Sequence, residues 1–328
     1  MLQAVPRLCL AHLPTPLVQP RRLGASMGLD LWVTRDDATS GAESGNKIRK
    51  LEFLLAEALE QSADTVITCG GLQSNHARAT ALCAAGLGLR TVLFLRTAAP
   101  EQGAPLEGNV LLDRLVGAEI RLITPEQYAD RDRIMADAAA ALAAEGRRAY
   151  VVPEGGSNGR GALGYVAAMA EVRQQLDGGV AEGGGFDVIV HACGSGGTAA
   201  GVALGAGQYG VAREVRVMAV CDDAPTFEAI IRRIVGEARA LVPALGEAAP
   251  WIVDERARGP AYAVSTAEQR ALMVKVARES GLILDPVYTG KAFAGLAAMN
   301  LKGARVLFLH TGGLPGLLAQ GASFAGEV

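Results

Sequence analysis

The sequence predicts an α/β fold built on parallel sheets with helices on both faces. Short apolar runs rich in β-branched residues alternate along the chain with longer stretches rich in Ala and Leu. Strands that are apolar throughout are typical of a sheet that is covered on both faces. Parallel strands also need long crossover connections, and the helix-like stretches between the runs supply them.

The predicted strands are seven apolar runs, at 65–70, 91–96, 119–124, 149–156, 187–194, 215–223 and 305–313. The periodic stretches predict helices at 74–88, 126–146, 160–177, 197–208 and 266–280, and a further helix begins near Asn46. These elements form two series, which meet near the glycine-rich segment 155–161. Many strands end in glycine, and ligands of open α/β sheets bind just beyond the carboxyl ends of the strands. We therefore expect the site at the strand ends.

Composition excludes several classes of protein. The 328 residues suffice for one large domain or two modest ones, and 31 basic against 34 acidic residues leave a formal charge of −3. This balance gives no electrostatic reason to expect nucleic acid or an anionic membrane as partner. The five cysteines are widely spaced and contain no C-x-x-C pair, and prolines interrupt the apolar residues near the N-terminus. We expect a cytoplasmic protein with a small-molecule partner, without disulfides, structural metal or membrane helix.

The stretch 43–55, ESGNKIRKLEFLL, places three cationic side chains at the start of a predicted helix. Its apolar face is formed by Ile48, Leu51, Leu54, Leu55 and Ala58. At about 100° per residue, Lys47 falls within that face, Arg49 points away and Lys50 lies near the boundary. Burial lowers the pKa of an ammonium and makes the amine able to form a Schiff base with a carbonyl. The alternative is a Lys47 that extends to solvent; Arg49 and Lys50 are expected to be ordinary solvated or ion-paired charges.

The segment 193–201, CGSGGTAAG, follows an apolar strand and opens an Ala-rich helix. Glycines allow backbone N–H groups to approach an anion, and a helix N-terminus adds partial positive charge, so a phosphate is the natural ligand. The same segment fits a dinucleotide-binding pattern through Gly194, Gly196 and Ala199, with Asp222 or Asp223 as a ribose-binding acid. A third possibility is a glycine-rich turn without a ligand.

Three other strand ends carry polar residues. In 70–80, Ser74 or Asn75 could cap the following helix, but the block Gln-Ser-Asn-His also suits a small carboxylate or a ring oxygen, while His76 alone is more often structural. In 284–296, a short predicted strand runs into Tyr288, which could stack on a planar ligand or fill core. Thr311 lies at the end of the last predicted strand and is either a turn residue or a partner for a ring nitrogen.

Taken together, these motifs resemble the fold type II pyridoxal-phosphate enzymes, in the branch that holds D-cysteine desulfhydrase and 1-aminocyclopropane-1-carboxylate deaminase. The resemblance runs in one order along nearly the whole chain. It implies a tryptophan synthase β-like fold, with two open, twisted, mostly parallel sheets and the active site between two domains. The large, cofactor-binding domain would comprise 1–47 and 156–328, and the small domain 48–155. Family members are commonly homodimers.

The resemblance also assigns roles by position in the shared motifs. The cofactor pyridoxal 5′-phosphate would be bound by Lys47, Asn75, Gly194, Ser195, Gly196, Gly197, Thr198, Tyr288 and Thr311. Lys47 would carry its aldehyde carbon, the glycine segment its phosphate, and Asn75 its ring hydroxyl, while Tyr288 would stack on the ring and Thr311 lie near its nitrogen. The substrate would meet Ser74, Asn75, His76, Tyr262 and Thr289, and the catalytic residues would be Lys47, Ser74, Tyr288 and Tyr262.

Two positions separate the branches. The cyclopropane deaminases are expected to carry an acid after the stacking tyrosine and glutamine after Ser-Asn, where this chain has Thr289 and His76. An acid keeps the pyridine nitrogen protonated for ring opening, whereas a neutral hydroxyl suits β-elimination of a good leaving group. We therefore expect a lyase that converts D-cysteine to pyruvate, ammonia and sulfide.

Four alternatives stay open. They are an L-cysteate sulfo-lyase, then the cyclopropane deaminase, and more remotely a nicotinamide-dependent dehydrogenase or a cofactor-binding homologue without turnover. The chain departs from the desulfhydrase-like pattern in GPAYAVS (259–265) and AESGNK (42–47), so its substrate pocket could differ even if its cofactor site does not.

Overall fold

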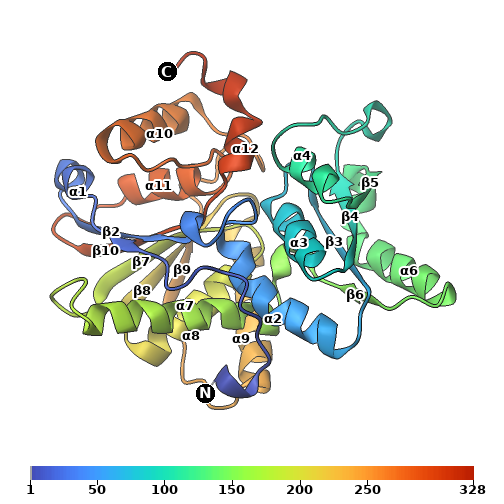
Figure 1. Ribbon diagram of the computed structural model, residues 1–328. Coiled ribbons are helices and arrows are strands. Elements are labelled where there is room, and N and C mark those ends of the chain that lie inside the picture. The colour runs from blue at the N-terminus through green and yellow to red at the C-terminus, as the bar shows by residue number, and fades with distance from the viewer. Residues whose placement is uncertain (1) are drawn as a thin grey trace.

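The computed structural model describes residues 2–328, and within them ten strands form two separate sheets (Figure 1). The six-stranded sheet has the order β1 (Leu17–Val18), β2 (Asp30–Arg35), β10 (Arg305–His310), β7 (Phe186–Cys193), β8 (Ala212–Ala219) and β9 (Trp251–Asp254). The four-stranded sheet has the order β5 (Glu119–Ile123), β4 (Arg90–Arg96), β3 (Thr65–Gly71) and β6 (Ala149–Val151). All neighbours are parallel except β1 and β2.

Helices cover both faces of the six-stranded sheet. Figure 1 shows α1 (Arg21–Met27), α10 (Ala267–Ser280) and α11 (Thr289–Ala297) on one face, and α7 (Gly159–Asp177), α8 (Gly197–Tyr209) and α9 (Ala224–Leu241) on the other. The four-stranded sheet is flanked by α3 (Asn75–Gly86), α4 (Gly108–Leu115), α5 (Pro125–Ala129) and α6 (Arg131–Ala144). α12 (Leu314–Leu318) packs against α4. Short 3-10 turns are η1 (Leu2–Ala4), η2 (Asp36–Ala38), η3 (Pro100–Gln102), η4 (Glu154–Gly156) and η5 (Gly321–Phe324).

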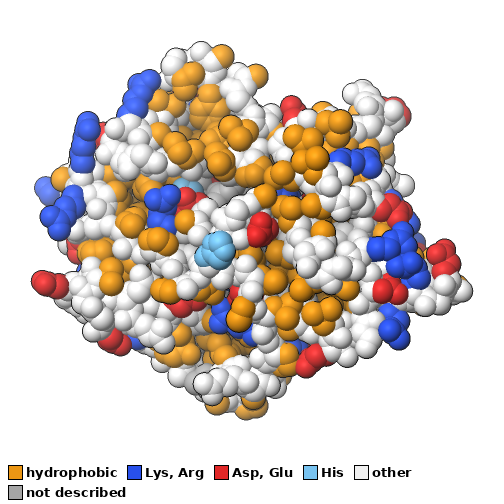
Figure 2. Space-filling view, in the orientation of Figure 1, with side chains coloured by type: hydrophobic (Ala, Val, Ile, Leu, Met, Phe, Trp, Pro, Cys, Tyr) orange, Lys and Arg blue, Asp and Glu red, His pale blue; other side chains and the backbone are white. Residues whose placement is uncertain are grey.

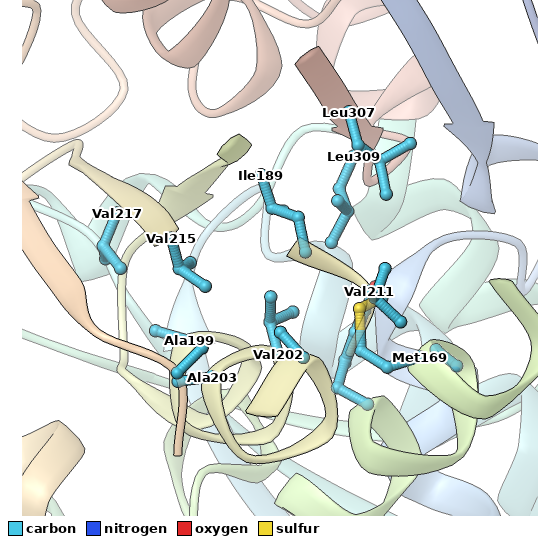
Figure 3. Packing of buried hydrophobic residues seen from close by; sticks show 14 of the residues in the cluster. Met169, Ile189, Ala199, Val202, Ala203, Val211, Val215, Val217, Leu307 and Leu309 are labelled. Carbon is cyan, nitrogen blue, oxygen red and sulfur yellow. The ribbon is translucent and has the colours of Figure 1, made fainter. Parts of the chain in front are cut away.

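The largest core lies between the six-stranded sheet and its α7 and α8 layer. Ile189, Val215 and Leu307 of the sheet meet Met169 of α7 and Val202 of α8 there (Figure 3). Glycines let the two helices approach closely: a Cβ built on Gly201 would lie 2.2 Å from the Ala162 carbonyl oxygen, and one on Gly205 would lie 2.6 Å from Met169 Cβ. This packing fixes the start of α8, where the glycine segment lies.

Helix α2 (Asn46–Glu60) connects the two sheets. Its predicted apolar face, formed by Ile48, Leu51, Leu54, Leu55 and Ala58, is buried against α3 and the four-stranded sheet. Phe53, on another side of the helix, packs on Leu163 and Val166 of α7. The predicted division into two domains at 47/48 and 155/156 stays a prediction, and α2 packs against elements on both sides of it.

The predicted α/β fold with two mostly parallel sheets is confirmed, but several elements were missed or wrong. The strand expected before Tyr288 does not form, because Asp285 holds that segment in a turn: its Oδ2 accepts hydrogen bonds from the backbone N–H groups of Val287 and Tyr288, each at 3.0 Å. The helix expected over 126–146 is divided at Asp130. The missed strands and α-helices are β1, β2, β9, α1, α4, α9 and α12.

Within residues 2–328, no helix combines the length and the apolar composition needed to cross a bilayer. The space-filling view of the face shown in Figure 1 shows charged side chains mainly around the rim (Figure 2). Apolar and uncharged atoms make up most of the middle of this face, where a histidine and a few charged side chains also lie.

Candidate active site

A cavity of about 550 Å³ lies at the carboxyl ends of the strands of both sheets. It continues into a narrow crevice, because Lys47, Gly194, Ser195 and Tyr288 line both. The crevice is completed by Asn46, Asn75, Ala192, Gly196, Thr198, Thr311 and Gly312. The larger cavity is also lined by Gly70, Gly71, Ser74, His76, Arg96, Tyr128, Arg131, Glu154, Cys221, Asp222 and Tyr262, among others. Residues from all five predicted motifs, distant in sequence, therefore share one hollow.

Lys47 reaches the crevice from the first turn of α2. The start of this helix is held by the loop after β10, since the Asn46 N–H donates to the Thr311 carbonyl oxygen at 3.1 Å. Gly45 has φ +125° there, and a Cβ on it would lie 3.1 Å from the same oxygen. Enclosure by protein lowers the pKa of the Lys47 amine to about 8, although Cys193 and Glu154 oppose the shift. About a tenth of this amine is therefore neutral and nucleophilic at pH 7, far more than for an exposed lysine.

The glycine segment after β7 forms an anion-binding turn. Gly196 has φ +81°, and a Cβ on it would lie 2.5 Å from Ile230 Cγ2. The first N–H groups of a helix have no partner within the helix, and those of α8 begin here. Gly197 N–H donates to Ser157 Oγ at 3.2 Å, and Thr198 Oγ1 accepts from Asn46 Nδ2 at 3.1 Å. Backbone donors at a helix N-terminus fit a phosphate group.

Lys50 lies directly beneath this turn, and the expectation that it is an ordinary surface charge is wrong. Only 1% of the residue is exposed, and Nζ donates to the carbonyl oxygen of Gly155 at 3.1 Å. A Cβ on Gly197 would lie 2.9 Å from Nζ. Burial, and then the nearby charge of Lys47, hold the pKa of Lys50 well below its ordinary value. No carboxylate pairs with it in the described chain, so an anion bound at the turn would be its counter-charge.

Arg49 is also buried, although it points away from the predicted apolar face of the helix. Burial opposes its charge, but Asp36 and Glu171 raise its pKa further. Its Nη2 lies 2.9 Å from Asp36 Oδ1 and its Nη1 lies 2.9 Å from Glu171 Oε1. The prediction from helical periodicity took α2 to be packed on one face only, whereas a second face of α2 packs on α7. Arg49 is thus ion-paired as one of the alternatives stated, but its role is structural.

Helix α3 brings Ser74, Asn75 and His76 to the site. Ser74 Oγ caps the helix by accepting from Ala77 N–H at 3.1 Å, and the residue also lines the cavity. His76 is buried, and its Nε2 lies 2.8 Å from Thr68 Oγ1, which donates to the Val152 carbonyl oxygen. Burial, and then the charges of Lys47 and Lys50, keep the pKa of His76 well below its ordinary value. His76 is therefore a neutral lining residue.

Two tyrosines form one wall of the cavity. The hydroxyl groups of Tyr262 and Tyr288 lie 2.8 Å apart, and a Cβ on Gly194 would lie 3.0 Å from Tyr288 Cε1. Burial raises the pKa of Tyr262 to about 12, and the pKa of Tyr288 lies well above its ordinary value for the same reason. Both tyrosines are therefore protonated at neutral pH and can donate protons.

Most of the predicted site residues meet at this hollow, but Thr289 does not. Thr289 is fully buried, lines neither the crevice nor the larger cavity, and donates its hydroxyl to Asp285 Oδ1 at 2.7 Å. Its position gives no support to the predicted contact with substrate. Thr311 does line the crevice, at the end of β10.

Four charged or aromatic residues that line the larger cavity were not predicted from the sequence: Arg96, Tyr128, Arg131 and Glu154. Arg96 ends β4, and its guanidinium carbon lies 4.6 Å from the ring centre of Tyr128 and 5.5 Å from that of Tyr262. Arg131 Nε lies 3.0 Å from Glu154 Oε2. The position of Arg96 at a carboxyl strand end could have flagged it, whereas no sequence signal marks the other three.

The residues of the crevice fit pyridoxal phosphate. They combine an amine of lowered pKa, a turn of backbone donors with the buried Lys50 side chain beneath it, a tyrosine ring and two polar side chains, Asn75 and Thr311. The dinucleotide alternative has less support, because neither proposed ribose-binding acid lines the crevice. Asp222 lines only the larger cavity, and the Asp223 side chain caps α9.

Comparisons with known proteins agree with this fit. The family described as "Pyridoxal-phosphate dependent enzyme" matches residues 8–312. The chain is 43% identical over 319 residues to a bifunctional D-cysteine desulfhydrase/1-aminocyclopropane-1-carboxylate deaminase of Arabidopsis thaliana, covering 94% of this chain and 78% of that one. It is 39% identical over 325 residues to a D-cysteine desulfhydrase of Serratia proteamaculans, covering 96% of each.

Solved structures show the same relationship. The crystal structure of an ACC deaminase homologue superposes with a TM-score of 0.89 at 36% identity, covering 100% of this chain and 98% of that one. A threonine deaminase of Solanum lycopersicum, 18% identical with a TM-score of 0.61 and covering 95% of this chain and 83% of that one, shares the fold alone.

Proposed function

This chain belongs to the D-cysteine desulfhydrase/1-aminocyclopropane-1-carboxylate deaminase family of pyridoxal-phosphate dependent enzymes, and on that basis we propose that it eliminates the β-substituent of a small amino acid. The substrate we propose first is D-cysteine, which with water gives pyruvate, ammonia and hydrogen sulfide. One observation carries the choice of elimination over ring opening. The crevice beside Lys47 and Tyr288 is lined by the neutral hydroxyl of Thr311 and by no carboxylate. A neutral partner for the ring nitrogen suits elimination of a good leaving group.

The described residues suggest how the cofactor is held. The backbone donors of Gly194–Thr198 and the Lys50 ammonium would bind its phosphate, Asn75 its ring hydroxyl and the Tyr288 ring its face. Lys47 would hold its aldehyde carbon. When bound, pyridoxal phosphate supplies an electron sink that acidifies the Cα–H bond of an amino acid.

The chain's own groups would then move the protons. The Lys47 amine, with a pKa of about 8, suits removal of the Cα proton near neutral pH. Ser74 and the N-terminus of α3 would orient the substrate carboxylate. The hydrogen-bonded pair Tyr262 and Tyr288 would supply a proton to the leaving sulfur, because both hydroxyls stay protonated at neutral pH.

The proposal is tested by reduction of the purified holoenzyme with borohydride, followed by peptide mapping and a pyruvate assay. We expect a pyridoxyl group on Lys47 and pyruvate from D-cysteine. The assay also includes L-cysteate, D-serine and the cyclopropane amino acid, which yields 2-oxobutanoate. A label on another lysine would overturn the assignment of Lys47. Higher kcat/KM on the cyclopropane amino acid would favour the deaminase, and a yellow protein without any product would favour a homologue that lacks turnover.

A second candidate, the L-cysteate sulfo-lyase, is favoured by Arg96. This guanidinium lines the cavity between two tyrosine rings, and in the described part of the chain it has no hydrogen-bond or ion-pair partner. The lining carboxylate Glu154 is paired with Arg131 instead. A free guanidinium is a good receptor for a sulfonate, which would leave as bisulfite while cysteate and water give pyruvate and ammonium.

Replacement of Arg96 separates the two candidates. If Arg96 binds a sulfonate, Arg96→Met lowers kcat/KM for cysteate about 100-fold and that for D-cysteine only a few-fold, since a charge-assisted hydrogen bond contributes about 1.5–3 kcal/mol. Arg121→Met is the matched control, because Arg121 is exposed on the neighbouring β5 and lines neither hollow. Equal losses for both substrates would remove the support for the sulfo-lyase.

The nicotinamide-dependent dehydrogenase is overturned by the family match. A homodimer in the cytoplasm stays a prediction from the resemblance and the cysteine content.

A further inference from the structure

Asn109 is a buried polar residue that touches the candidate site without lining it. It is the second residue of α4 and is fully buried. Its Nδ2 lies 3.0 Å from the Gln73 carbonyl oxygen and 3.1 Å from Asn75 Oδ1, and its backbone N–H donates to Gln73 Oε1 at 2.8 Å. The α4 start is thereby tied to the residues that lead into α3.

These contacts determine which way the Asn75 amide faces. A backbone carbonyl oxygen can only accept, so the Asn109 atom next to Gln73 O must be the nitrogen. The same nitrogen lies against Asn75, so the Asn75 atom that it meets must be the oxygen. Asn75 lines the crevice, and its Nδ2 has no hydrogen-bond partner among residues 2–328. The Asn75 amide therefore presents a donor, not an acceptor, to the crevice.

Asn109 is held in place by close packing of its neighbours against α12 and against the turn before α3. Gly108 has φ +52°, and a Cβ on it would lie 2.7 Å from the Pro315 carbonyl oxygen of α12 and 2.6 Å from Gln73 Oε1. On the other side, a Cβ on Gly316 would lie 3.7 Å from Asn109 Nδ2. Asn109 thus lies in a tight junction between α4, α12 and the turn before α3, and its amide has little freedom to rotate.

We propose that Asn109 is a positioning residue that keeps the Asn75 NH₂ group directed into the crevice. The proposal rests on the assignment of Asn75 to the cofactor's ring hydroxyl made under the proposed function. A donor at that position favours the ionised form of the ring oxygen, whereas an acceptor disfavours it. Asn109 would in this way influence cofactor affinity and the protonation of the bound cofactor without touching it.

The test compares Asn109→Asp and Asn109→Ala with the wild type. A carboxylate accepts only, so Asn109→Asp draws the Asn75 NH₂ group toward itself and turns Asn75 Oδ1 into the crevice. We expect its dissociation constant for pyridoxal phosphate to rise about 10-fold or more, with a shifted pH midpoint of the visible absorption. Asn109→Ala releases the amide without reversing it, and we expect a rise of about 3-fold.

A double-mutant cycle shows whether Asn109 acts through Asn75. In an Asn75→Ala background, Asn109→Asp should change neither the dissociation constant nor the absorption further. Thr266→Ala is the control for lost stability, because Thr266 caps α10 through a capping box and lines neither the crevice nor the larger cavity. The proposal is overturned if Asn109→Asp behaves like wild type, if its effect persists without the Asn75 amide, or if Thr266→Ala reproduces it. Cofactor binding is measured without substrate, so failure of the proposed D-cysteine activity would leave this result intact.

Discussion

At the scale of single residues, the site depends on two lysines three positions apart on α2. Lys47 faces the crevice with a pKa of about 8, while Lys50 is buried beneath the glycine turn with a pKa well below its ordinary value. Neither has a carboxylate within ion-pair distance in the described chain. One amine is therefore prepared for a covalent partner and the other for an anion.

The pKa of Lys47 predicts how the cofactor-free protein takes up pyridoxal phosphate. Only the neutral amine condenses with an aldehyde, so the rate should rise about tenfold per pH unit below pH 8 and level off above it. If Lys47 were a fully exposed lysine with a pKa of about 10.4, the rate would continue to rise between pH 8 and pH 10. Stopped-flow absorbance over pH 6 to 10 measures the midpoint. A midpoint near 10 would show that Lys47 is not desolvated.

The position of Lys50 predicts opposite effects of Lys50→Met on the two forms of the protein. Loss of a charge-assisted contact to phosphate should raise the dissociation constant for pyridoxal phosphate about 10- to 100-fold. Without cofactor, Lys50→Met removes a buried amine that has no carboxylate partner in the described chain, so the unfolding midpoint should stay unchanged or rise. Lys275→Met is the control, since Lys275 is exposed on α10. Unchanged cofactor affinity would contradict the assignment of Lys50.

At the scale of elements, the site depends on how closely α2 crosses α7. A Cβ on Gly164 of α7 would lie 2.3 Å from the Arg49 carbonyl oxygen and 2.9 Å from the Lys50 backbone nitrogen. Only a glycine permits this crossing, and the crossing presses the first turns of α2, with Lys47 and Lys50, against the glycine turn. The crossing of α2 and α7 therefore positions both lysines relative to the glycine turn that would bind the cofactor's phosphate.

Two glycine-to-alanine substitutions in helices should have opposite signs. Gly164→Ala forces α2 and α7 apart and should cost about 3 kcal/mol of unfolding free energy, together with cofactor affinity. Gly236 lies in α9 with no heavy atom within 4 Å of its built Cβ, so Gly236→Ala should stabilise by about 0.5–1 kcal/mol. Urea denaturation of both variants measures the difference. A neutral Gly164→Ala would show that the crossing is not tight.

At the scale of the whole molecule, Arg49 ties distant segments together. Its guanidinium meets Thr15 near the N-terminus, Asp36 after β2 and Glu171 on α7. Asp36 also accepts from the hydroxyl of Tyr165. This buried network joins the six-stranded sheet to the helix that carries Lys47, so we expect it to matter for stability and not for catalysis.

Removal of Arg49 should therefore destabilise the fold strongly. Arg49→Leu leaves two carboxylates, Asp36 and Glu171, without their cation, and should cost about 3–5 kcal/mol of unfolding free energy. Arg133→Leu removes two exposed ion pairs, to Asp130 and Asp137, and should cost at most about 1 kcal/mol. Chemical denaturation of the cofactor-free proteins compares them. A loss near that of Arg133→Leu would contradict the structural role of Arg49.

Sequence patterns predicted most long, apolar elements, although the 18-residue α9 and the inner strand β2 were missed, and they predicted short or edge elements poorly. The strands at β3, β4, β7 and β10 are buried on both faces, and hydrophobic runs of that kind are visible in sequence. β1 and β9 have only two and four residues, too few for a periodic signal. The strand expected before Tyr288 failed because an apolar run does not reveal that Asp285 binds the following N–H groups.

The sequence by itself determined the α/β class, the family, the lysine at the start of α2 and the glycine turn, because each rests on local periodicity or on a motif of contiguous residues. Only the tertiary structure decided that Lys50 and Arg49 are buried, that Thr289 lies outside the site, and that Arg96 and Asn109 belong near it. Burial and hydrogen bonding depend on which surfaces pack together, and α2 packs on two sides where helical phase alone predicted one. Contacts between residues far apart in the chain leave no mark in either segment taken separately.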